Sequence, residues 1–139
     1  LGWFEFKNSG DVKILNDVPH ILQKHLVRGL IDGDGGFSVY QRKNRIGIEK
    51  QFFFCDRFPS VVSWMAQWIH MNADCTLARI RKSSQGNVYM MFLSGGKQFK
   101  RIVSSISGNP CMQRKAKTAF MGVGDVTHSQ LERAFKMSI

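Results

Sequence analysis

The sequence predicts an α+β fold in which an antiparallel sheet carries helices on one face, with the element order αββαββα. Two stretches alternate apolar and polar residues with period two, and helical spacing precedes and follows each of them. The chain has 139 residues, 43% of them hydrophobic and 12% aromatic, which suits one domain with a real core. This composition excludes a disordered chain. No apolar run is long enough to span a bilayer, and the start does not resemble a signal peptide.

Three segments are expected: a lead-in segment (1–18), one folded domain (19–121) and a helical tail (122–139). The lead-in has no steady period, so it should hold at most a short strand after a turn near Gly10. The chain begins at Leu1 rather than Met, which indicates a trimmed or excised fragment, or processing.

The first helix should open at Pro19, with Asp17 as a nearby cap, and end at a glycine cluster. Its helical spacing is carried by Ile21, Leu22, His25, Leu26, Gly29, Leu30 and Gly33.

The first hairpin should start at Phe37 and turn at 43–45. Its apolar face should include Phe37, Val39, Ile46, Ile48, Phe52 and Phe54. The second helix should open at Pro59 and bury Val62, Met65, Ala66 and Ile69.

In the second hairpin, one set of alternating residues predicts the apolar face: Ala78, Ile80, Val88, Met90 and Phe92. The other set predicts the outward face: Arg79, Arg81, Asn87, Tyr89 and Met91. A third helix is expected over 97–107, and the tail should hold a last helix around 129–136.

The chain is strongly basic, with 20 Lys and Arg against 10 Asp and Glu, a formal net charge of +10. A compact domain with this charge favours a polyanionic partner, with nucleic acid the usual one. An acidic membrane surface and general solubility are the alternatives. Arg, Asn and Gln on a hairpin suit base edges in the major groove, although an ordinary solvated sheet face has similar residues. The candidate DNA-binding residues are Ser38, Tyr40, Arg42, Asn44, Arg45, Gln51, Arg79, Arg81, Asn87 and Tyr89.

Asp32 and Asp34 should lie at the carboxyl end of the first helix, where the helix dipole disfavours carboxylates. A divalent cation would reverse this effect, and oxygen ligands suit Mg²⁺ or Ca²⁺. Local turn capping by the aspartates is the alternative, and the ligand ladder of an EF-hand is missing. The three cysteines lack zinc-ligand spacing, which indicates reduced thiols of an intracellular protein.

The stretch VRGLIDGDG, residues 27–35, resembles the LAGLIDADG motif of homing endonucleases, from which it differs at Val27, Arg28 and Gly33. The motif and the element order together cover about residues 1–121. The resemblance implies a half-domain with a saddle-shaped sheet. The lead-in LGWFEFKNSG followed by the motif resembles the second half of two-motif members. With one motif found, either a homodimer or one half of a larger chain is implied.

The resemblance also implies roles for single residues. Asp34 would bind the catalytic metal, assisted by the carbonyl of Gly33, and Asp32 would hold the end of the motif. Gly29 and Gly33 would pack two motif helices together. The family has a polar, water-positioning residue at the end of the second strand, where this chain has Phe54 or Cys55, and Asp56 or Gln51 would substitute. Lys115, with Arg114 and Lys117 close by, would stabilise charge at the phosphate.

The implied function is site-specific hydrolysis of double-stranded DNA, as in intron homing. Mg²⁺ would be the cofactor, and Ca²⁺ or Mn²⁺ would substitute for it in binding. The alternative is a DNA-binding protein or an intron RNA maturase that keeps the fold without cutting. A bacterial, a phage and an organellar host all remain open.

Overall fold

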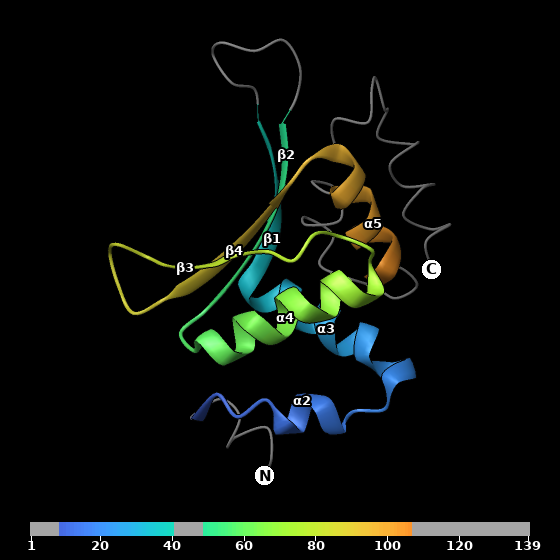
Figure 1. Cartoon of the computed structure of the whole chain (residues 1–139), viewed down its shortest axis with the longest axis vertical. Helices are drawn as coiled ribbons and strands as arrows, with labels where there is room; N and C mark the ends of the chain where they lie inside the picture. The colour runs from blue at the N-terminus through green and yellow to red at the C-terminus, as the bar shows by residue number, and fades with distance from the viewer. Residues whose placement is uncertain (1–8, 41–48, 107–139) are drawn as a thin grey trace.

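The computed structural model describes residues 9–40 and 49–106. A short helix, α2 (Lys13–Asp17), precedes the long helix α3 (His20–Asp34), which leads directly into the strand β1 (Gly35–Tyr40). The other elements, in chain order, are β2 (Glu49–Asp56), α4 (Pro59–Asn72), β3 (Ile80–Lys82), β4 (Tyr89–Ser94) and α5 (Gly96–Ile106) (Figure 1). The order αββαββα is therefore confirmed, with α2 added before it.

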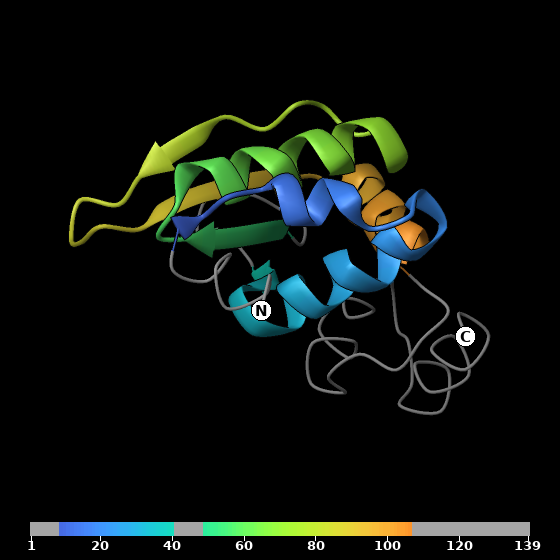
Figure 2. The same ribbon diagram turned by 90° about the horizontal axis from the view of Figure 1, so that it is seen from below.

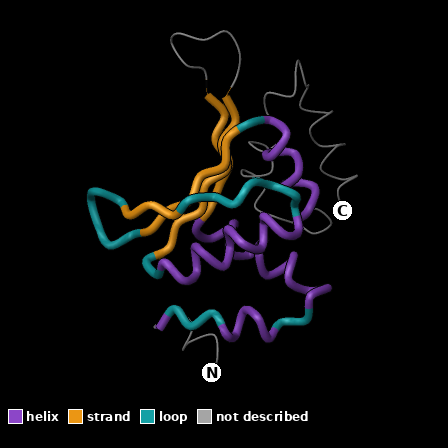
Figure 3. The backbone as a smooth tube through the Cα atoms, in the orientation of Figure 1, coloured by secondary structure: helices purple, strands orange, loops and turns teal. Residues whose placement is uncertain are grey.

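The four strands form one sheet in the order β1-β2-β4-β3, and every neighbouring pair is antiparallel. The sheet is twisted, so the β1–β2 hairpin and the β3–β4 hairpin project in different directions (Figure 1). The helices gather on one side of the strands (Figure 3), as the sequence predicts. The predicted turn at 43–45 lies outside the described residues.

The hydrophobic core lies between the sheet and the helices. Phe52 and Phe54 of β2 are fully buried, and they are opposite Leu93 and Met91 of β4. These four side chains therefore share one face of the sheet, which we call the inner face. Helix α4 buries the four predicted residues against the same core: Val62, Met65, Ala66 and Ile69.

The predictions for the two helices at the start of the domain were partly wrong. Residues 13–17 form α2 rather than a strand, and this helix buries Leu15 in the core with Ile14 partly buried against it. Asp17 ends α2 and does not cap α3, whose N-cap is Pro19, without a side-chain hydrogen bond. The first turn of α3 thus begins without the predicted carboxylate cap.

The predicted alternation of the second hairpin was out of phase in β4. Met91 and Leu93 face the core, so Met90 and Phe92 lie on the opposite face. Tyr89 packs against the core cluster instead of sharing a face with Arg81. The cause is the run Tyr89–Leu93, which is apolar throughout and gives no period-two signal.

Helix α2 lies beside α4 (Figure 2). A hydrogen bond of 2.8 Å from the Trp64 indole Nε1 to Asn16 Oδ1 joins the two helices. We expect Asn16→Ala to lower the free energy of unfolding by about 1 kcal/mol, the net worth of one such hydrogen bond. Urea titration followed by tryptophan fluorescence measures this change. Asp17→Ala, which removes the next exposed side chain, is the control and should have a smaller effect. Equal midpoints for both variants would contradict the prediction.

Candidate nucleic-acid interface and acidic site

The acidic site is built around the point where α3 becomes β1. Asp34 is the last residue of α3, and Gly35 begins β1 with no loop between them. Asp32 and Asp34 lie in the last helical turn, as predicted, and Asp34 is exposed. Carboxylates here lie at the negative end of the helix dipole, which disfavours them unless a positive group is nearby.

Gly35 explains how the chain makes this transition. It is buried, and an added Cβ would lie 3.0 Å from the carbonyl oxygen of Phe53 and 3.2 Å from Cα of Ile31. A side chain at this position would therefore push β1 away from β2. The missing side chain lets the end of α3 lie directly against β2.

The end of β2 lies beside Asp34. Gly35 is opposite Phe54 in the sheet, and the Cys55 thiol donates a hydrogen bond of 3.2 Å to the carbonyl oxygen of Asp34. Asp56, the next residue, accepts a hydrogen bond from the Phe58 N–H at 2.9 Å. The end of β2 therefore brings a thiol and a second carboxylate to the end of the motif helix.

Asp34 and Asp56 influence each other electrostatically. Burial raises the pKa of the Asp56 carboxyl, the hydrogen bond from Phe58 opposes this rise, and the Asp34 charge adds to it. The second carboxylate at this site is therefore easier to protonate than an ordinary aspartate. A cation near both groups would lower this repulsion.

Gln51 lies away from this acidic site. It is opposite Ser38 on β1, four residues before Cys55 on the same strand. Four residues of strand span about 13 Å. Among the residues suggested from sequence for the end of β2, Cys55 and Asp56 are therefore the ones beside Asp34.

The donor set at the helix end fits part of a magnesium site. Carboxylate oxygens and the carbonyls of a last helical turn are the hard ligands that Mg²⁺ prefers. Within the described part of the chain, no group of three or more His, Cys, Asp or Glu side chains is arranged to hold a metal ion.

The face of the sheet opposite the core is the second candidate surface, which we call the outer face. On the strands it carries Ser38, Gln51, Phe53, Cys55, Arg81, Met90, Phe92 and Ser94. The ring of Phe53 lies across the neighbouring strand at Gly36, where an added Cβ would come within 2.8 Å of the ring. This face is polar towards β1 and β3 and apolar along the middle of β2 and β4.

An open groove of about 700 Å³ lies on this surface. Its polar lining includes Gln51, Ser94, Arg79 and Arg81, and its apolar lining includes Phe92, Leu77 and Ala78. Both arginines are exposed. The groove thus combines positive charge and hydrogen-bond donors with an apolar surface.

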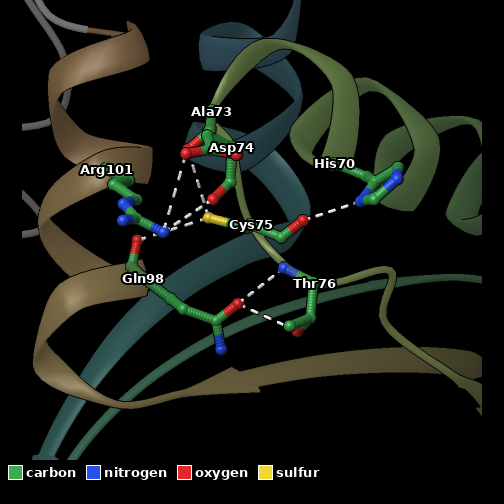
Figure 4. A network of polar contacts seen from close by, with 7 residues as sticks. All are labelled: His70, Ala73, Asp74, Cys75, Thr76, Gln98 and Arg101. Atoms are coloured by element: carbon green, nitrogen blue, oxygen red, sulfur yellow. Dashed lines mark hydrogen bonds and ion pairs between the residues drawn. The ribbon is translucent and has the colours of Figure 1, made fainter.

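A network of polar contacts holds the wall of the groove next to α5. Arg101 Nη1 donates to the carbonyl oxygen of Asp74 at 2.8 Å, and Asp74 has a left-handed φ of 53°. Gln98 Oε1 accepts from both the backbone N–H and the hydroxyl of Thr76, at 2.8 and 2.9 Å (Figure 4). These contacts attach the segment that leads to Arg79 firmly to α5.

Cys75 lies inside this network and is 4% exposed, whereas Cys55 is half-buried. Burial raises the pKa of the Cys75 thiol, so less reactive thiolate forms at pH 8. We expect iodoacetamide to alkylate Cys75 about tenfold more slowly than Cys55 in the native protein. Peptide mass spectrometry resolves the two rates, and unfolding in urea should make them equal. Equal rates in the native protein would contradict this prediction.

The remaining predicted residues are placed as follows. Ser38 is half-buried on the outer face, and Asn87 is exposed in the turn before β4. Tyr40 ends β1. Six candidate site residues lie outside the described residues: Arg42, Asn44, Arg45, Arg114, Lys115 and Lys117. The predicted tail helix lies outside them as well. Sequence reasoning missed Phe92, because the phase of β4 cannot be read from an all-apolar run.

One face of helix α3 is not covered by the rest of the described domain. Gly29 and Gly33 are exposed, and a Cβ added at either would meet no atom within 4 Å. Ile21 and Leu22, on the same helix, are 77% and 49% exposed. By contrast, Val27 and Arg28 are both buried. These are two of the three positions at which residues 27–35 differ from the LAGLIDADG motif. Within the described residues, every helix is too short or too polar to cross a lipid bilayer.

A solved LAGLIDADG meganuclease has the same fold as this chain. The chain superimposes on the meganuclease I-AabMI, solved bound to uncleaved DNA, with a TM-score of 0.51 and 14% identity over 82% of its residues. I-CvuI, in complex with the I-CreI target in the presence of 2 mM Mg with its DNA not cleaved, gives a TM-score of 0.48 at 14% identity over 85% of the chain. I-TnaI gives a TM-score of 0.47 at 14% identity over 84%.

The α+β fold is therefore that of the homing endonuclease half-domain. The chain spans 36% of the length of the I-AabMI chain, 66% of I-CvuI and 97% of I-TnaI. No protein-family model matches the sequence, and no curated protein matches it.

Proposed function

We propose that this chain is a LAGLIDADG half-domain that binds double-stranded DNA on the outer face and hydrolyses it at Asp34. One observation carries this proposal: Asp34 is exposed at the carboxyl end of α3, beside Cys55 and Asp56, in a domain with a net charge of +10. Acidic residues at the carboxyl end of a helix are disfavoured by the helix dipole unless a cation is bound near them. A basic protein that carries this acidic site can attract DNA and hold a metal ion against the DNA backbone.

Asp34, with the carbonyl of Gly33, would hold Mg²⁺, and Asp32 would support the end of the helix. The metal, when bound, would activate water and stabilise charge on the phosphate. DNA oxygens and the Asp34 of a second half would complete the ligands. Lys115 would stabilise the negative charge that develops on the phosphate.

The exposed face of α3 supports a paired arrangement. We infer that Gly29 and Gly33 allow the backbone of a second motif helix to approach closely, either in a homodimer or in a longer chain. Each half would then read its own side of a target through Ser38, Gln51, Arg79 and Arg81. Gln51 is better suited to this reading role than to catalysis, because of its distance from Asp34.

Cleavage of a randomised target library tests the proposal. We expect cut DNA with Mg²⁺, and bound but uncut DNA with Ca²⁺. Enriched cut sites should share one sequence. Cutting without sequence preference, or no cutting with either metal, would contradict the proposed endonuclease.

A second function is favoured by Cys55. Cys55 stands in the region where the homing endonucleases carry a polar, water-positioning residue. Its thiol already donates a hydrogen bond to the Asp34 carbonyl oxygen. A half-domain that binds DNA, or an intron RNA, without cutting fits this observation. Tight Mg²⁺-independent binding with no cleavage supports this alternative.

A further inference from the structure

Phe92 has an unusual position for an aromatic side chain. It lies half-buried on the outer face, opposite Phe53 of β2, and it lines the groove together with Arg79, Arg81 and Gln51. Ile80 is opposite Met91 in the sheet, so continuing that register puts Arg79 opposite Phe92. Phe53 is therefore the cross-strand neighbour of Phe92 in β2, and Arg79 and Arg81 line the same groove as the Phe92 ring.

The cross-strand pairing of Phe92 with Phe53 accounts for the place of Phe92 in the sheet, but the ring of Phe53 lies over Gly36 of β1. This pairing does not explain the groove or its two exposed arginines. Charge complementarity indicates a polyanion as the occupant, because Arg79 and Arg81 lie within a domain of net charge +10. A groove that combines exposed arginines with an apolar surface, to which Phe92 contributes its ring, is complementary to a base edge that has both hydrogen-bonding atoms and an apolar group.

Thymine has such an edge. In the major groove it presents a C5-methyl group beside an acceptor, and Phe is among the side chains that contact this methyl. Arg and Gln are the side chains that contact the edges of guanine and adenine. We propose that Phe92 recognises a thymine methyl in the target, next to bases read by Arg79, Arg81 or Gln51. This inference rests on the proposed binding of double-stranded DNA by the outer face.

A uracil scan tests the inference on the full chain. Each thymine of a selected target is replaced in turn by deoxyuridine, which removes only the methyl group, and affinity is measured with Ca²⁺ to prevent cutting. We expect one position per half-site at which binding weakens about fourfold, the worth of one buried methyl group. At that position Phe92→Ala should show no difference between thymine and uracil.

Phe53→Ala is the matched control, because it removes the other large ring of the outer face. It should keep the fourfold difference at the Phe92 position. A second readout needs no variant: 5-bromodeoxyuridine at that position should photo-crosslink to the peptide that contains Phe92. Thermal melts followed by circular dichroism check that both variants fold.

Three results would overturn the inference: no thymine whose methyl matters, a methyl effect that persists in Phe92→Ala, or a crosslink to another peptide. In each case sequence-specific DNA binding would still stand. A chain that prefers single-stranded RNA, or binds no DNA, would overturn the proposed function as well. The scan therefore distinguishes failure of the thymine-methyl inference from failure of the proposed DNA-binding function.

Discussion

Replacing Asp34 by Asn is expected to reduce DNA cleavage by a factor of about a hundred to a thousand, as when a group that stabilises developing charge is removed. The substitution keeps the size of the side chain and removes the charge that would hold Mg²⁺. Because Asp34 is exposed at the end of α3, the fold should not change. Single-turnover cleavage of a selected target with Mg²⁺ measures the effect.

The affinity of the Asp34→Asn variant for DNA should not fall with its cleavage rate. Asp34→Asn removes a negative charge near DNA phosphates, so affinity measured with Ca²⁺ absent should be unchanged or higher. Asp17→Asn, on the exposed surface of α2, changes the net charge equally and should leave cleavage intact. Full cleavage by Asp34→Asn would remove the basis of the proposed endonuclease.

Replacing Gly29 by Leu is expected to have two effects of opposite sign. A Cβ added at Gly29 would meet no atom within 4 Å, and glycine costs a helix up to about 1 kcal/mol relative to good helix formers. The isolated half-domain should therefore become more stable by about 0.5 to 1 kcal/mol. A denaturant titration at low protein concentration measures this gain.

The same leucine should prevent two motif helices from packing closely. Overpacking costs about 1 to 3 kcal/mol at each site, and a symmetric pair has two such sites, so association should weaken by a factor of about a hundred. Sedimentation on target DNA measures it, and double-strand cutting should fall in parallel. Gly86→Ala, in the exposed turn of the second hairpin, is the control. Unchanged association would show that α3 is not the contact between halves.

Much of the fold could be predicted from sequence because its signals are local. Pro19 and Pro59 mark the places where α3 and α4 begin, and period-two alternation around Phe52 and Phe54 identifies the inner face of β2. The position of Asp34 at the end of a helix follows from the glycines around it. These features depend on residues only a few positions apart.

Other features depend on contacts between segments far apart in the chain. The five residues Tyr89–Leu93 are apolar throughout, so only packing against α4 and α5 decides which of them face the core. That decision turns Phe92 outward into the groove. Likewise, only the register of β1 with β2 brings Cys55 and Asp56 to Asp34, across more than twenty positions of sequence.

The sequence by itself therefore determined the element order, the basic charge and the acidic end of the motif helix, because each is encoded in residue type or short-range period. The tertiary structure decided which side chains share the outer face and which groups meet at Asp34. Both depend on strand pairing, where a slip of one residue moves every side chain to the opposite face.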